Sequence, residues 1–86
     1  MNKGKVLYKT GAEIAKYLKI SKSTMSVILS RADFFKYYQG GVYCIDRDFA
    51  MSLYNYLELK RRTSIDARQR YGMAQRQLYQ WLKRLS

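Results

Sequence analysis

The sequence predicts a mainly α-helical fold with one small β-hairpin, followed by a C-terminal helical hairpin. Apolar residues recur at the i, i+3, i+4 spacing of a helix over several stretches. Two runs rich in aromatic and β-branched residues flank Gly40-Gly41, a pair that suits a tight β-turn. We therefore expect a first domain at residues 1–62, which contains the β-hairpin, and a helical hairpin at residues 63–86.

The first two helices are expected at residues 11–18 and 22–31, the second ending as late as residue 33. Thr10 and Glu13 have the spacing of a capping box, in which each side chain satisfies an amide at the start of the first helix. Ser21 can cap the second helix. The residues expected on the buried side of this pair are Ile14, Ala15, Leu18, Ile20, Met25, Ile28 and Leu29.

The β-structure is expected before the first helix and after the second. Residues 6–8 form a short apolar run that fits a brief strand. Residues 34–46 fit a hairpin, because Gly tolerates the positive φ that two-residue turns require. In that register Tyr38 faces Tyr43, and Tyr37 faces Cys44.

A third helix is expected from a cap at Asp46 or Asp48 to the basic residues 60–62. Its inward residues are expected to be Phe49, Leu53, Tyr56 and Leu57, with Ala50 and Tyr54 beside them. A fourth helix should start at a Thr63 cap, run to about Tyr71 and stop at Gly72. The last helix is expected at about 75–85 with Leu78, Trp81, Leu82 and Leu85 on one side, and residues 61–64 are the expected hinge.

The composition points to a polyanionic partner. Seventeen Lys and Arg stand against six Asp and Glu, a formal charge of +11 on 86 residues. Such an excess generates a strong positive field, for which nucleic acid is the first expected partner and an anionic membrane surface the second. No stretch approaches the ~20 apolar residues that span a bilayer, and no apolar run of signal-peptide length follows the N-terminus. We expect a cytoplasmic protein that makes no membrane contact.

The side-chain inventory argues against catalysis and metal binding. The chain has no histidine, and Cys44 is its only cysteine, so neither a disulfide within the chain nor a His/Cys metal site can form. The six carboxylates are scattered, without a motif that pairs them for acid–base chemistry. We therefore expect no enzyme activity, no cofactor, no metal and no small-molecule ligand.

Residues 12–31 resemble the helix-turn-helix of bacterial and phage regulators. Ala15 is the small residue that lets the two helices approach, and the apolar residues named above occupy the buried positions of that motif. The family usually has Gly where this chain has Lys19, which must then accept a positive φ or a different turn. A hairpin directly after the second helix resembles the wing of winged helix-turn-helix proteins, although Lys36 is its only cation.

This resemblance implies sequence-specific binding of double-stranded DNA by a small regulator of the kind found on phages, plasmids and mobile elements. The expected function is transcriptional regulation, as a repressor that occupies operator DNA through a recognition helix at 22–31, in the bacterial cytosol or nucleoid. The alternatives are an excisionase, a plasmid replication or partition adaptor, and a basic RNA-binding protein. A homodimer or a head-to-tail assembly on DNA is expected.

Two groups of residues are expected to contact DNA. In the first domain they are Ser21, Lys22, Ser23, Thr24, Ser26, Val27, Ser30, Arg31 and Lys36. Residues 67–83 resemble a second helix-turn-helix, of the transposase and resolvase kind, with one residue too many between Ala67 and Gly72. It implies DNA contacts from Gln75, Arg76, Gln77, Tyr79 and Gln80. The alternative for this unit is a hairpin that buries Leu78 and Trp81 against a second subunit.

Overall fold

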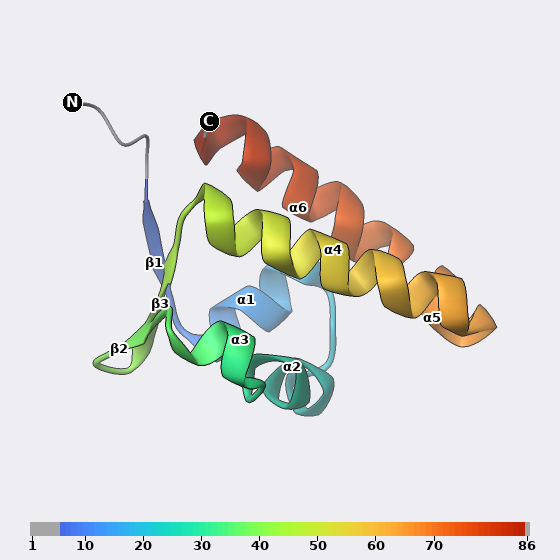
Figure 1. Cartoon of the computed structure of the whole chain (residues 1–86), viewed down its shortest axis with the longest axis horizontal. Coiled ribbons are helices and arrows are strands. Elements are labelled where there is room, and N and C mark those ends of the chain that lie inside the picture. Colours follow the sequence, from blue (N-terminus) through green and yellow to red (C-terminus); the bar gives the residue numbers. More distant parts are fainter. Residues whose placement is uncertain (1–5, 86) are drawn as a thin grey trace.

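The computed structural model describes residues 6–85. Residues 1–5 and 86, which the expected ranges 1–62 and 63–86 include, lie outside the described residues. In chain order the elements are β1 (Leu7–Lys9), α1 (Gly11–Leu18), α2 (Lys22–Leu29), α3 (Ala32–Phe35), β2 (Tyr38–Gln39), β3 (Val42–Ile45), α4 (Arg47–Thr63), α5 (Ile65–Arg70) and α6 (Gly72–Leu85). The chain is mainly helical with a small antiparallel sheet, as predicted at that level (Figure 1).

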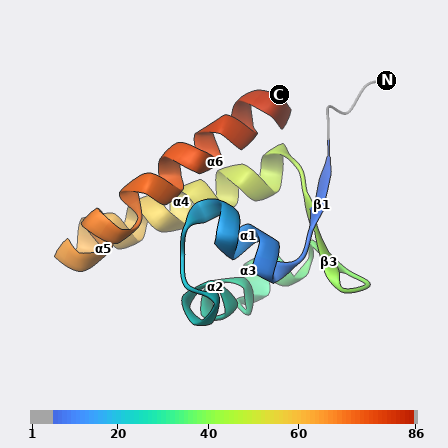
Figure 2. The ribbon, with the colours of Figure 1, turned by 180° about the vertical axis from the view of Figure 1, so that it is seen from behind.

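The two longest helices form the upper layer of the fold. α4 and α6 run side by side, with α1, α2 and α3 beneath them and the sheet at one end (Figures 1 and 2). The described part of the chain measures 42 × 25 × 21 Å. One continuous apolar core, which includes Ile14, Leu53 and Trp81, joins the two layers. The last helices therefore share their core with the first helices.

The start of α1, its turn into α2 and the α2 cap form as predicted. The Thr10 amide donates to Glu13 Oε1 over 2.8 Å, and the Glu13 amide donates to Thr10 Oγ1 over 3.1 Å. The amide of Thr10 thereby holds the pKa of Glu13 below its usual value. Lys19 has φ 59° and ψ 40°, so it adopts the left-handed conformation that the motif usually assigns to Gly. Ser21 caps α2 by accepting from the Thr24 amide over 3.3 Å.

The structure corrects the predicted end of the second helix and start of the hairpin. α2 ends at Leu29, the backbone of Arg31 is extended, and Phe34 and Phe35 belong to the short helix α3. The predicted helix at residues 22–31 therefore extended too far. The predicted strand from Phe34 was wrong, because Phe34 is helical. The physical reason is tertiary packing, because a helical turn buries Phe34 edge-on against Phe49, with ring centres 5.7 Å apart.

The β-turn and its register form as predicted. Tyr38 pairs with Tyr43, and the Cys44 amide donates to the Tyr37 carbonyl over 2.8 Å. Gly40 and Gly41 have φ of 59° and 94°, a conformation that disfavours residues with a Cβ. The predicted strand 6–8 forms one residue later as β1, which pairs with β3 and completes a sheet of order β1-β3-β2.

The C-terminal helices differ from prediction at their junctions. Asp46 caps α4, accepting from the Phe49 amide over 2.8 Å as expected. α4 continues through Thr63, whose hydroxyl bonds back to α4 carbonyls, and Ser64 caps α5 instead. Gly72 begins α6, so the helix starts three residues earlier than expected and only Tyr71 lies between the two helices. Residues 61–63 of the expected hinge are therefore helical.

An aromatic stack fixes α6 to α1. The rings of Tyr17 and Trp81 are 4.3 Å apart and nearly parallel, and the Tyr17 hydroxyl donates to the Gln77 carbonyl over 3.0 Å. Leu78 is fully buried and Trp81 is 2% exposed within this chain. The alternative in which these two side chains are buried against a second subunit is therefore wrong, because the chain already covers them.

Candidate nucleic-acid interface

The side of α2 that faces away from the core is a continuous exposed surface. Met25, Ile28 and Leu29 are buried, as predicted. Val27, by contrast, is 65% exposed although it is apolar. We define the outer face of α2 as its exposed residues together with its two exposed caps, Ser21 and Ser30. The face thus consists of Ser21, Lys22, Ser23, Ser26, Val27 and Ser30. Thr24, also predicted as a site residue, is half-buried.

The polar groups of this outer face are partly used within the helix. The Ser21 hydroxyl donates to Thr24 Oγ1 over 2.8 Å, and the Ser30 hydroxyl donates to the Val27 carbonyl over 2.8 Å. Lys22 and Ser26 make no side-chain hydrogen bond or ion pair within residues 6–85. Their ammonium and hydroxyl groups are therefore available to a ligand.

A hollow of about 310 Å³ adjoins the outer face of α2. It is lined by Gly11, Ala12, Lys22, Ser26, Leu29, Ser30, Phe35 and Tyr43, which come from α1, α2, α3 and β3. Phe35 is 58% exposed, so an aromatic ring stands beside the hydroxyl groups of α2. Neither Phe35 nor Tyr43 is among the predicted contacts, because the sequence pattern places both in the hairpin and does not reveal that Phe35 ends the short helix α3 and is exposed.

The two predicted cations beside α2 both lie over tyrosine rings. The Arg31 guanidinium carbon is 5.3 Å from the ring centre of Tyr56, and Lys36 Nζ is 5.2 Å from that of Tyr37. Both cations are exposed. Lys36 precedes β2, and residues 38–45 of the hairpin carry no charged side chain. The hairpin itself therefore offers tyrosines and glycines to a ligand.

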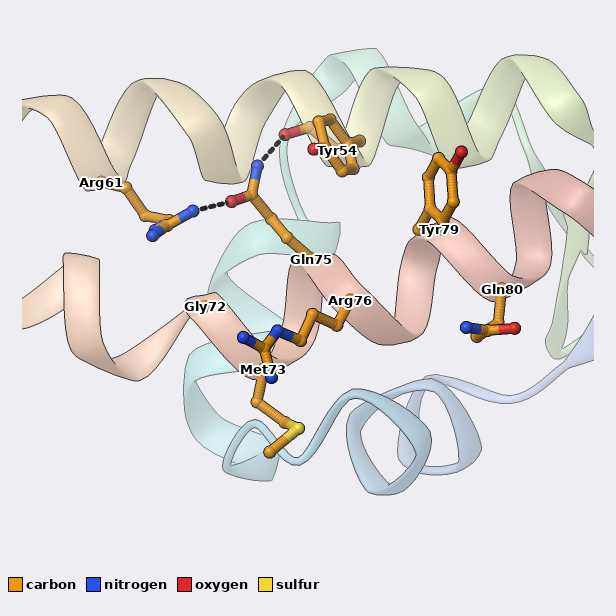
Figure 3. Close-up of a pocket in the computed structure, with 8 residues that line it drawn as sticks. All are labelled: Tyr54, Arg61, Gly72, Met73, Gln75, Arg76, Tyr79 and Gln80. Carbon is orange, nitrogen blue, oxygen red and sulfur yellow. Dashed lines mark hydrogen bonds between the residues drawn. The ribbon is translucent and has the colours of Figure 1, made fainter.

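Gln75, a predicted site residue, is part of a buried network between α4 and α6. It is 4% exposed, and the oxygen of its side-chain amide accepts a hydrogen bond from Arg61 (Figure 3). Its amide donates to the Tyr54 carbonyl over 3.4 Å and to Glu58 Oε1 over 3.0 Å. The hydrogen bond from Gln75 is the main cause that lowers the pKa of Glu58, and the Arg62 side chain lowers it further. The structure therefore leaves no Gln75 group at the surface to meet DNA, contrary to its predicted role.

The other predicted residues of α6 differ in their exposure. Arg76, Tyr79 and Gln80 are exposed and line a groove of about 620 Å³ between α4 and α6. Gln75 and Tyr79 project toward α4, whereas Arg76 and Gln80 lie farther from it (Figure 3). Gln77 is half-buried beside Tyr17. The exposed predicted residues of α6 thus line one groove, whereas Gln75 is buried and Gln77 is half-buried.

Positive charge is spread over the molecule and is densest away from α2. Residues 60–76 contain six Lys and Arg and one acid, Asp66. Within the described range, the only ion pair joins Arg62 to Glu58, at 3.3 Å. The same range contains no helix long and apolar enough to cross a membrane and no group of three His, Cys, Asp or Glu side chains suited to a metal. The electrostatic field of the protein is therefore strongly positive, and its few acidic side chains offset little of it.

Comparisons of this chain with protein-family models, with curated proteins and with solved structures find no match. We therefore infer the function from the geometry of the residues.

Proposed function

We propose that this chain is a sequence-specific double-stranded DNA-binding protein with a winged helix-turn-helix, in which α2 enters the major groove. The single observation that carries the proposal is the exposed outer face of α2, presented on a helix that crosses α1 after the left-handed Lys19 turn. A helix is about 10–12 Å across and the major groove is about 12 Å wide, so the fit needs short outward side chains. Ser23, Ser26 and Ser30 meet that need.

The chemistry of the outer face supports base recognition together with phosphate binding. Hydroxyl groups donate to or accept from base edges, and Lys22 can donate to guanine. The methyl groups of Val27 and the ring of Phe35 can contact the methyl group of thymine. The charge of +11 supplies salt-dependent attraction to the phosphates.

We further propose a regulatory role for the same surface. The chain would act as a repressor by occupying operator DNA, and the uncharged hairpin would approach the DNA backbone with Lys36 beside it. Excisionase and plasmid replication or partition roles use the same kind of contact and are the alternatives. α5 and α6 are a weaker candidate for DNA reading, because Tyr71 alone separates them and Gln75 is buried.

RNA binding is the second candidate function. Tyr8, Tyr38 and Tyr79 are 62%, 47% and 54% exposed, and exposed aromatic rings can stack on unpaired bases. Tyr8 pairs with Cys44 and Tyr38 pairs with Tyr43, so these two rings lie on opposite faces of the sheet, and Tyr79 lies on α6. The three rings therefore do not form one stacking platform. DNA binding through α2 is favoured for that reason.

Selection of bound duplexes from random DNA, followed by affinity measurements across salt concentrations, tests the proposal. We expect a defined sequence to be enriched, and log K to fall linearly with log salt by about 0.9 for each phosphate contacted. Single-stranded RNA of the same length should bind more weakly. A palindromic site with half-sites ~34 Å apart indicates a homodimer, and an asymmetric site indicates a monomer or a head-to-tail array. RNA preference, or no duplex binding even in dilute salt, contradicts the proposal.

A further inference from the structure

Tyr56 brings two cations together from distant parts of the sequence. The guanidinium carbon of Arg31 and Nζ of Lys60 lie 5.3 Å and 5.5 Å from the centre of its ring. The ring is half-buried and meets Phe34 edge-on at 6.2 Å. Because α4 and α3 hold the ring, both cations lie beside one fixed group.

These two positive charges lack a paired counter-charge. Neither cation forms an ion pair within residues 6–85, and Lys60 and Arg31 are both exposed. The ring face attracts each cation electrostatically but does not neutralise it. Asp33 is the only acid among the residues that line the hollows beside Arg31 and Tyr56, and it forms no ion pair with either cation. Both cations are therefore available to bind anionic groups from outside the protein.

The location of the pair suggests which anion this is. Arg31 follows the last turn of α2, so it stands at the end of the outer face opposite to Lys22. In helix-turn-helix complexes the first residues of the recognition helix contact base edges, which leaves its other end nearer to the sugar–phosphate backbone. Lys60, which the sequence reasoning did not include, reaches the same place from α4.

We propose that Arg31 and Lys60, positioned by Tyr56, form a phosphate clamp that binds the backbone of the DNA strand bordering the major groove. This inference depends on the proposed function, since it needs α2 in the groove. The clamp adds affinity and fixes the register of α2, and it reads no base. Tyr56 is a positioning residue and makes no phosphate contact of its own.

Lys60→Gln tests the clamp, with Lys83→Gln as a matched control. Lys83 is also an exposed lysine whose Nζ lies over a tyrosine ring, 5.6 Å from the centre of Tyr79 on α6. Both variants remove one charge and one cation–ring contact, so their effects on net charge and on folding are matched. We expect Lys60→Gln to reduce the slope of log K against log salt by about 0.9, the value for one phosphate. The slope for Lys83→Gln should equal that of the unchanged protein.

Further variants separate positioning from charge. Lys60→Arg should restore the slope, because it restores the cation. Tyr56→Phe should bind as the unchanged protein does, since it keeps the ring face, whereas Tyr56→Leu should lose about as much slope as Lys60→Gln. Thermal unfolding identifies any variant that is not folded.

The outcomes distinguish the clamp from the function on which it depends. If the unchanged protein binds no duplex, the proposed function fails. If it binds duplex DNA with the expected salt dependence, but Lys60→Gln has the same slope as Lys83→Gln, only the clamp is overturned.

Discussion

Replacing Ser26 with glutamate is expected to abolish specific DNA binding while leaving the fold intact. Ser26 is exposed at the centre of the outer face of α2 and makes no side-chain hydrogen bond within the described residues. A carboxylate there would face the phosphates and base edges of the groove, and juxtaposed like charges at an interface cost several kcal/mol. A cost of about 3 kcal/mol lowers affinity by more than about 100-fold. Anisotropy with the selected duplex measures this change.

Gln69→Glu is the control for this experiment. Gln69 is an exposed residue of α5, and its replacement changes the net charge by the same amount. Both variants should have melting temperatures close to that of the unchanged protein, because surface substitutions usually shift stability by no more than about 0.5 kcal/mol. If Ser26→Glu binds the selected site as well as Gln69→Glu does, α2 is not the reading helix.

Replacing Trp81 with alanine should cost a large part of the stability of the protein. Trp81 is 2% exposed and stacks on Tyr17 at 4.3 Å, so the change leaves a cavity between α1 and α6. Such truncations cost about 3–5 kcal/mol, and loss of the ring pair adds about 0.5–1.5 kcal/mol. Domains of this size have about 5–15 kcal/mol in total. Denaturant unfolding followed by circular dichroism should therefore show a free energy of unfolding that is lower by about 3–6 kcal/mol.

Tyr79→Ala provides the comparison, since Tyr79 lies two residues away on α6 and is 54% exposed. It should change the free energy of unfolding by less than about 1 kcal/mol. The pair also tests whether α6 stabilises the helices that carry the proposed site. Unchanged unfolding of α1 and α2 in the Trp81 variant would show that the C-terminal helices fold as a separate unit.

Local capping and turn chemistry made much of the fold predictable. Thr10 and Glu13, Ser21, and the Gly40-Gly41 turn each satisfy a need that arises within a few residues of the chain. The three parts formed where the sequence indicated, because no distant contact competes with them. Lys19 shows the same principle, since a turn of fixed length required its positive φ.

Tertiary contacts decided the parts that were predicted wrongly. Phe34 and Phe35 suit a strand by composition, but burial of Phe34 against Phe49 selects a helical turn. Thr63 and Ser64 are both good capping residues, and the extension of α4 selects Ser64. No local pattern distinguishes these choices.

In the candidate site, too, local sequence predicted some features and tertiary contacts decided others. The outer face of α2 was predictable, because burying Met25, Ile28 and Leu29 leaves a fixed set of residues outside. The burial of Gln75 was not, because it depends on Arg61 and Glu58 meeting it from α4. The Tyr56 cluster likewise unites Arg31 and Lys60, which are far apart in sequence.

Titration of the ¹⁵N-labelled chain with the selected duplex, followed by NMR, tests most directly whether α2 lies in the major groove. We expect the largest amide shift changes at residues 21–31, with smaller changes near Lys36 and Lys60. Signals of residues 75–80 on α6 should stay close to their free positions. Shift changes confined to the groove between α4 and α6, with α2 unaffected by duplex DNA, would contradict the account.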